Sequence, residues 1–119
     1  MFNFFKKKDK DYLKDFAVQY NIKRDEDGKI IITSCNKSAK EIFRAYNSGV
    51  YPRAVIDGVN YVLTNVERNI DDGTYYFCYR SVMLSKNVMK VFDFPVCHSK
   101  DDSDIYIERE PKALVFEGK

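Results

Sequence analysis

Hydrophobic residues repeat at helical spacing near the start of the chain. Between residues 9 and 20 they are Tyr12, Leu13, Phe16, Ala17 and Tyr20. This spacing places the five side chains on one face of an amphipathic helix, and Asp9 or Asp11 is suited to cap its first turn. The pattern therefore predicts a helix over residues 9–20.

A β-hairpin and a second helix are predicted next. Short strands are expected at residues 22–24 and 29–33, on either side of the turn at 25–28, whose sequence Asp-Glu-Asp-Gly is typical of a hairpin. Further along, Ser38 stands three residues before Glu41, as in a capping box, and hydrophobic residues follow at helical spacing. We therefore predict a second helix over residues 37–48, closed by a glycine cap.

Beyond residue 50 the pattern changes to strands separated by turns. The predicted strands are 53–56, 59–67, 74–84, 88–96, 104–108 and 112–117. Turns at Asp57-Gly58 and around Gly73 make the first three an antiparallel meander. Pro95 and Pro111 should restrict two later strands to sheet edges or strand ends. Five or six such strands usually form a small barrel or a strongly bent sheet.

These elements predict a single α+β domain. We expect a basic aromatic arm over residues 1–8 and a domain over 9–119, helical over 9–49 and an antiparallel sheet over 50–119. With 119 residues, one core is expected. The predicted core residues are Leu13, Phe16, Ile31, Ile42, Phe43, Val55, Tyr61, Leu63, Phe77, Val82, Leu84, Val91, Ile105 and Val115.

Composition and charge narrow the possible functions. The chain is 45% hydrophobic and 32% charged, which favours a folded protein over a disordered one. Twenty Lys and Arg residues against 18 Asp and Glu leave a net charge of +2, which excludes a general electrostatic grip on nucleic acid or membrane. The odd number of cysteines, three, excludes a fully paired disulfide framework and favours a reducing cytoplasm. We find no apolar run long enough to span a membrane.

The richest cluster of reactive side chains surrounds His98, the only histidine. Cys97 precedes it, and Asp101, Asp102 and Asp104 follow. Neighbouring residues on a strand point to opposite faces, so Cys97 and His98 are poorly placed to share a metal ion. We therefore interpret this stretch as a solvated loop and expect no catalytic residue, metal site or cofactor. An enzyme is the less favoured interpretation.

Two surfaces are predicted to bind protein. The first is the N-terminal arm, and the second is the outward side of the strand over residues 74–84. The residues that we assign to protein binding are Phe2, Phe4, Phe5, Lys6, Lys7, Tyr76 and Arg80. Tyrosine and arginine are frequent anchors of protein interfaces. Alternation along the strand places Tyr75, Phe77 and Tyr79 on one face and Tyr76, Cys78 and Arg80 on the other, and one of these two faces could instead stack its rings on single-stranded nucleic acid.

Residues 53–80 resemble the core hairpins of small head-completion, or head-closure, proteins of tailed bacteriophages. The shared pattern is a strand ending in a glycine turn at Gly58, an aromatic and aliphatic strand, a short acidic turn at Gly73 and a closing strand. The resemblance implies a structural subunit of a virion neck that joins a ring or neighbouring subunits and has no catalytic residue. The alternatives are a small inhibitor of one host enzyme and a barrel that binds single-stranded nucleic acid.

Overall fold

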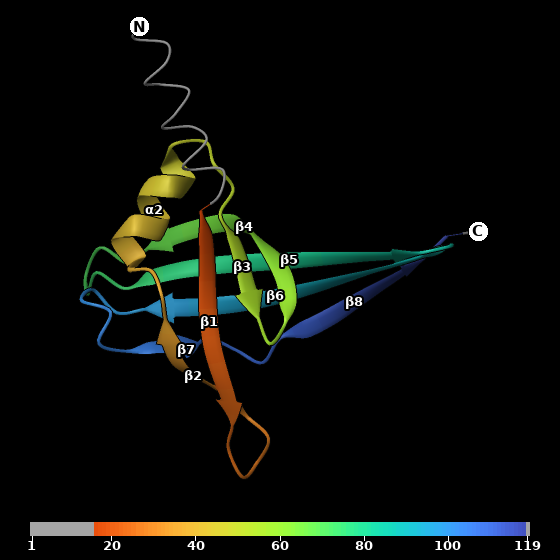
Figure 1. The fold of residues 1–119 in the computed structure, drawn as a ribbon, viewed down its shortest axis with the longest axis horizontal. Coiled ribbons are helices and arrows are strands. Elements are labelled where there is room, and N and C mark those ends of the chain that lie inside the picture. Colours follow the sequence, from red (N-terminus) through yellow and green to blue (C-terminus); the bar gives the residue numbers. More distant parts are fainter. Residues whose placement is uncertain (1–15, 119) are drawn as a thin grey trace, which may run out of the picture.

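Strands dominate the structure. The computed structural model describes residues 16–118, in which eight strands form one sheet and one helix packs beside it (Figure 1). The elements are β1 (Ala17–Arg24), β2 (Ile30–Cys35), α2 (Ala39–Asn47), β3 (Arg53–Ile56), β4 (Val59–Arg68), β5 (Tyr75–Ser85), β6 (Val88–His98), β7 (Ile105–Ile107) and β8 (Lys112–Glu117).

The sheet is strongly bent. Its strand order is β2-β1-β3-β4-β5-β6-β7, and β8 pairs with β6 beside β7. All pairs are antiparallel except β1 with β3, because the chain returns through β2 and α2 before it adds β3. The first and last strands of this order, β2 and β7, lie close together but share no backbone ladder, so the sheet does not close into a barrel.

The core lies on the concave side of this bend. Its central side chains are aromatic: Phe77 and Tyr79 from β5 and Tyr20 from β1 are almost completely buried. Alternating residues of each strand point inward, and Ile42 of α2 adds an aliphatic side chain. The inward side of residues 74–84 is therefore that of Tyr75, Phe77 and Tyr79, whose rings are not exposed for stacking on bases.

Locally encoded features are confirmed. The second predicted helix is α2, and its capping box is complete: Glu41 N donates to Ser38 Oγ, and Ser38 N donates to Glu41 Oε1. The hairpin of β1 and β2 and the hairpin of β3 and β4 also form. Asp57 and Gly58 turn the second hairpin with φ angles of 53° and 77°, values that Asp and Gly tolerate well.

The predicted α+β class is wrong, because the described chain is mostly β with one helix, and the expected N-terminal helix is not present over its last residues. Ala17–Tyr20 belong to β1 and pair in parallel with Arg53–Ile56 of β3. Phe16, Val18 and Tyr20 point inward with the two-residue period of a strand, and this period coexists in the sequence with the helical one. The part of the predicted helix over residues 9–15, like Leu13 and the arm over 1–8, lies outside the described residues.

Three strands extend away from the rest of the molecule (Figure 1). β5 and β6 each contain 11 residues, but β4 pairs with β5 only as far as Val62 and Arg80. Beyond that point β5 and β6 continue as a hairpin, and β8 adds a third strand. We call this extension, residues 81–85, 88–93 and 112–117, the distal sheet, and the rest of the described chain the body.

The distal sheet explains most errors in the predicted core. Val82, Leu84 and Val115 are at least half exposed, because they lie where no other layer covers the sheet. Val82 and Leu84 also point to the side of β5 opposite Phe77, so these three residues cannot share one buried face. Ile31 is exposed on β2 as well. The prediction is confirmed for Phe16, Ile42, Tyr61, Leu63, Phe77 and Val91, which are buried; Phe43, Val55 and Ile105 are half-buried.

The predicted edge position of Pro95 is also wrong, since β6 lies inside the sheet. Pro95 falls between the segment of β6 that pairs with β8, which ends at Asp93, and the segment that pairs with β7, which begins at Val96. Its carbonyl accepts a hydrogen bond from Glu108 N on that side. The missing N–H therefore faces the place where β6 changes partners, and no ladder bond is lost.

Candidate functional site

Four buried or half-buried polar side chains form a hydrogen-bonded chain through the body. Tyr79 of β5 lies 2.7 Å from Tyr20 of β1, measured between hydroxyl oxygens, and the Tyr20 hydroxyl lies 2.7 Å from Nε2 of His98. Nδ1 of His98 lies 2.8 Å from Oδ1 of Asp102, in the loop before β7. We call these four residues the polar chain.

The direction of each hydrogen bond follows from Asp102. Its Oδ1 accepts from Ala39 N, at the start of α2, and from Nδ1–H of His98. With the proton on Nδ1, Nε2 of His98 is an acceptor, so Tyr20 donates to it and Tyr79 donates to Tyr20. Every member thus has a partner, and no buried side-chain nitrogen or oxygen in the described part of the molecule lacks one.

Burial keeps the inner members of the polar chain neutral. It lowers the pKa of His98, although Asp102 acts in the opposite direction through its hydrogen bond and charge. It also raises the pKa of Tyr20 and of Tyr79. Asp102 is the accessible end, because its side chain is 27% exposed while that of His98 is fully buried. The backbone of Asp102 adopts a left-handed φ of 61°, which aspartate tolerates better than most residues.

This arrangement corrects the interpretation of residues 97 and 98 as a solvated loop. Both belong to β6 and are buried. They do point to opposite faces: His98 enters the polar chain, whereas Cys97 lies opposite Tyr106 of β7. Burial raises the pKa of Cys97 to about 11, so its thiol stays protonated at neutral pH. Nε2 of His98 is occupied by Tyr20, and a substrate would have to displace that side chain to reach it.

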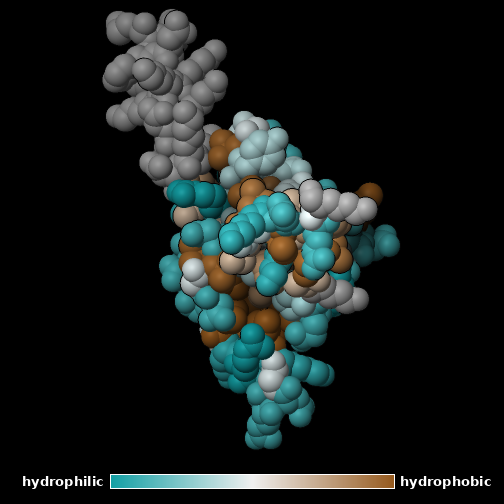
Figure 2. Space-filling view, turned by 90° about the vertical axis from the view of Figure 1, so that its right-hand side faces the viewer, coloured by the Kyte–Doolittle hydropathy of each residue, from teal (hydrophilic) through white to brown (hydrophobic). Residues whose placement is uncertain are grey.

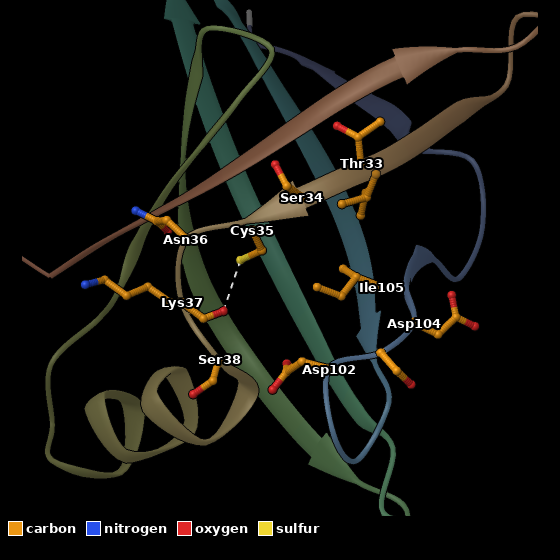
Figure 3. Close-up of a pocket in the computed structure, with 11 residues that line it drawn as sticks. Thr33, Ser34, Cys35, Asn36, Lys37, Ser38, Asp102, Asp104 and Ile105 are labelled. Atoms are coloured by element: carbon orange, nitrogen blue, oxygen red, sulfur yellow. Dashed lines mark hydrogen bonds between the residues drawn. The ribbon is translucent and has the colours of Figure 1, made fainter.

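A pocket of about 510 Å³ lies beside the accessible end of the polar chain (Figure 3). It is formed by β2 with the segment that leads to α2 and by the loop that leads to β7; Cys35, Ser38, Asp102 and Ile105 are among its lining residues. Cys35 Sγ donates to the carbonyl of Lys37 at 3.2 Å, and burial raises the pKa of the thiol. This cysteine is therefore a poor nucleophile. Among the described residues, no group of three His, Cys, Asp or Glu side chains is placed to hold a metal ion.

The predicted protein-binding residues do not gather at one place. Phe2, Phe4, Phe5, Lys6 and Lys7 lie outside the described residues. Tyr76 is half-buried on the outer side of β5, where a shallow hollow also includes Pro95 and Arg109. Arg80 is exposed and pairs with Asp93 of β6 at 2.9 Å, at the boundary between body and distal sheet.

The distal sheet carries an exposed hydrophobic surface that was not predicted from the sequence. The even-numbered residues of β5 and β8 share one face with the odd-numbered residues of β6, because Val82 pairs with Val91 and Val91 pairs with Leu114. We call this surface the outer apolar face, and its members are Val82, Leu84, Met89, Val91, Leu114 and Phe116. Seen from the end of the distal sheet, hydrophobic atoms (brown) reach the surface between hydrophilic ones (teal) (Figure 2).

Four of the six members of this face are exposed. Val82, Leu84, Leu114 and Phe116 are each at least half exposed, and Leu84 reaches 75%. The signal in the sequence was the pair of hydrophobic residues two positions apart in each strand: Val82 and Leu84, Met89 and Val91, and Leu114 and Phe116. Monomeric proteins rarely leave such contiguous surfaces open unless the surface binds something.

Comparisons with known proteins do not assign the chain to a family. No known family, curated protein or solved structure matches the chain. Within residues 16–118, no helix is both long enough and apolar enough to cross a membrane.

Proposed function

We propose that this chain is a non-enzymatic assembly subunit that binds other protein subunits, first of all copies of itself, through the outer apolar face. The observation that carries the proposal is the position of that face on a sheet that extends from the body (Figure 1). An extended sheet with an exposed hydrophobic side reaches a neighbour without any change in the body.

Burial of the outer apolar face should contribute favourably to the free energy of association. Complete burial of one large aliphatic or aromatic side chain stabilises by about 1.5–3 kcal/mol, and of the exposed members of the face Val82, Leu114 and Phe116 are already about half covered. Each should therefore add roughly 1 kcal/mol when a second subunit covers it. None of the six members of the face is charged, and Arg80, beside them on the same side of β5, is paired with Asp93.

The resemblance of residues 53–80 to phage head-completion proteins gives this proposal a setting. A structural subunit of a virion neck works by contacts with several neighbours and is made in the host cytoplasm before it joins the particle. Inhibition of one host enzyme is the competing function, and it predicts a different composition of the complex.

Mass measurement by light scattering tests the proposal. The purified protein should show a mass above that of the monomer, rising with concentration. Phe116→Asp, which places a charge in the outer apolar face, should lower this mass. Ile70→Asp is the matched control, because Ile70 is 95% exposed in a turn of the body, and its mass should equal that of the parent protein.

Two outcomes contradict the proposal. One is a protein that stays monomeric over the whole concentration range. The other is recovery from the source cells of a one-to-one complex with a single host enzyme and no virion protein, which would establish the inhibitor. If Phe116→Asp and Ile70→Asp lower the mass equally, association does not use the outer apolar face.

Single-stranded nucleic acid is a second candidate partner, on one specific observation. Lys40, Arg44 and Arg68 surround a hollow of about 550 Å³ beside α2 that also includes Phe43 and contains no acidic side chain. Cations around an aromatic side chain suit a single strand. Fluorescence anisotropy with a labelled oligonucleotide should then show binding that weakens with salt and is lost in the double variant Arg44→Glu, Arg68→Glu. If the parent protein and the double variant bind the oligonucleotide equally, the hollow beside α2 is not a nucleic-acid site.

A further inference from the structure

The backbone of β5 has an unpaired edge in the distal sheet. On one side β5 pairs with β6 without interruption from Tyr75 to Ser85. On the other side its pairing with β4 ends at Arg80, and among the described residues no strand takes over from there. Residues 81–85 therefore present one open edge.

A hydrogen bond in β6 determines which backbone groups point to this edge. Glu108 N donates to the Pro95 carbonyl at 3.0 Å, so Pro95 directs its backbone groups toward β7 and β8. The direction alternates along a strand, and the two groups of one residue point to the same side. Even-numbered residues of β6, such as Lys90, therefore direct their N–H and C=O groups toward β5.

The register carries this alternation across to β5. Lys90 pairs with Met83, so Met83 directs its backbone groups toward β6. Its neighbours Val82 and Leu84 direct theirs the opposite way, toward the open edge. The backbone N–H and C=O groups of Val82 and Leu84 are thus the groups left without a strand partner.

We propose that two copies of the chain pair antiparallel through this edge, about a twofold axis at Met83. In this register Val82 of one copy stands opposite Leu84 of the other, and each of these pairs exchanges its backbone hydrogen bonds. Met83 stands opposite its own counterpart, and Ser81 stands opposite Ser85. Hydrophobic side chains meet hydrophobic ones on the outer apolar face, and the serines meet on the opposite face.

Other symmetric registers leave backbone groups unused. An axis at Leu84 would place Val82 opposite Lys86, which lies in the turn beyond β5. An axis at Val82 would place Leu84 opposite Arg80, which is already paired with Val62. Only the axis at Met83 uses all the open groups with no charged side chain in the ladder.

The sequence of the edge agrees with a paired edge rather than a protected one. Natural proteins block open edges with proline, with lysine or other charges, or with bulges. Residues 81–85, Ser-Val-Met-Leu-Ser, contain none of these residues, and the β5–β6 register shows no bulge here. The pairing rests on the proposed self-association, and it joins the outer apolar faces of two copies into one larger surface that further subunits can cover.

Disulfide trapping with Met83→Cys tests the register. In an antiparallel pair without mutual hydrogen bonds, opposite Cα atoms lie about 4.5 Å apart, within the range of a disulfide. Met83→Cys should therefore give a covalent dimer under mild oxidation. Ser85→Cys is the control, because the two copies of residue 85 would stand about 13 Å apart along the strands. The parent protein corrects for its three native cysteines.

The result separates this pairing from the proposed function. A covalent dimer of Met83→Cys, with little from Ser85→Cys or the parent, supports the pairing. The dimer should also form when Met83→Cys is combined with Phe116→Asp, since Phe116 lies on β8, away from the open edge. Equal crosslinking of residues 83 and 85, or none in a sample that is oligomeric by mass, overturns the pairing while the proposed function stands. A monomeric parent protein overturns both.

Discussion

The body and the distal sheet share the strands β5 and β6 but use them in opposite ways. In the body, inward side chains such as Phe77 are completely covered and the polar chain leaves no buried donor or acceptor unpaired. In the distal sheet, hydrophobic side chains such as Leu84 remain exposed and β5 has an open edge. The change occurs at the Arg80–Asp93 ion pair, where β4 stops.

This difference separates stability from association. The same strand is part of a core where β4, β1 and α2 surround it, and it becomes a surface where they do not. The free energy of unfolding should therefore depend on the body, while the mass of the assembly should depend on the distal sheet. Changes confined to one region should therefore separate the two properties.

The largest effect is expected from a cavity in the body. Phe77→Ala should reduce the free energy of unfolding by about 3–5 kcal/mol, because the ring is 1% exposed and nothing nearby fills its space. Leu84→Ala, in the distal sheet, should cost less than about 1 kcal/mol. Denaturant unfolding of both variants at low protein concentration measures the difference. Equal losses would show that the distal sheet is part of the core.

The next effect is a dependence of stability on pH through His98. Burial lowers the pKa of His98 in the folded chain, so the unfolded chain binds a proton at a pH where the folded chain does not. The free energy of unfolding should therefore fall as the pH drops below the ordinary histidine value of about 6.5, with a slope of at most about 1.4 kcal/mol per pH unit. Below the folded pKa this dependence should cease.

His98→Gln should remove that slope whatever it does to stability itself. The comparison is made between pH 7.5 and 5, above the range in which the exposed carboxyls Asp72 and Asp101, whose pKa values are lowered, take up protons. Association through the distal sheet should not change over the same range, since no member of the outer apolar face titrates. An identical slope in parent and variant would contradict the assignment to His98.

A smaller effect is expected at the far end of the polar chain. Tyr79→Phe removes the hydroxyl that donates to Tyr20 and leaves the bond from Tyr20 to His98 intact. The expected loss in the free energy of unfolding is about 0.5–1.5 kcal/mol. Tyr76→Phe on the outer side of the same strand is the matched control and should change stability by less. If Tyr79→Phe and Tyr76→Phe reduce the free energy of unfolding equally, the polar chain does not stabilise the body.

The smallest effect on folding is expected in the outer apolar face. Leu114→Ala should change the free energy of unfolding of the monomer by no more than about 0.5 kcal/mol, since the side chain is half exposed. The same change should weaken association, which sedimentation at several concentrations measures. A large loss of stability without any change in association would reverse the roles of the two regions.

Features set by nearby residues could be predicted from the sequence. The helix α2 follows from Ser38 and Glu41, and the hairpin of β3 and β4 follows from Asp57 and Gly58. These signals act within a few residues, so they need no information about the rest of the fold. The strands of the meander were found for the same reason.

Features set by distant partners could not be predicted in this way. His98 lies in the core, where Tyr20, 78 residues away in the sequence, donates a hydrogen bond to it. Its neighbours Ser99 and Lys100 suggest a loop instead. Ala17–Tyr20 form a strand because β3 pairs with them. Val82 is exposed because the pairing of β5 with β4 ends at Arg80. The hydrophobicity of the residues along β5 does not indicate that boundary.

Hydrogen exchange at the backbone of residues 82–84 tests the central claim most directly. In dilute protein the N–H of Met83, bonded to β6, should be protected, whereas those of Val82 and Leu84 should exchange rapidly. With rising concentration the N–H groups of Val82 and Leu84 should become protected, while Tyr79 in the body stays unchanged. Protection of Val82 and Leu84 that is already complete in the monomer, or that never depends on concentration, would contradict the account.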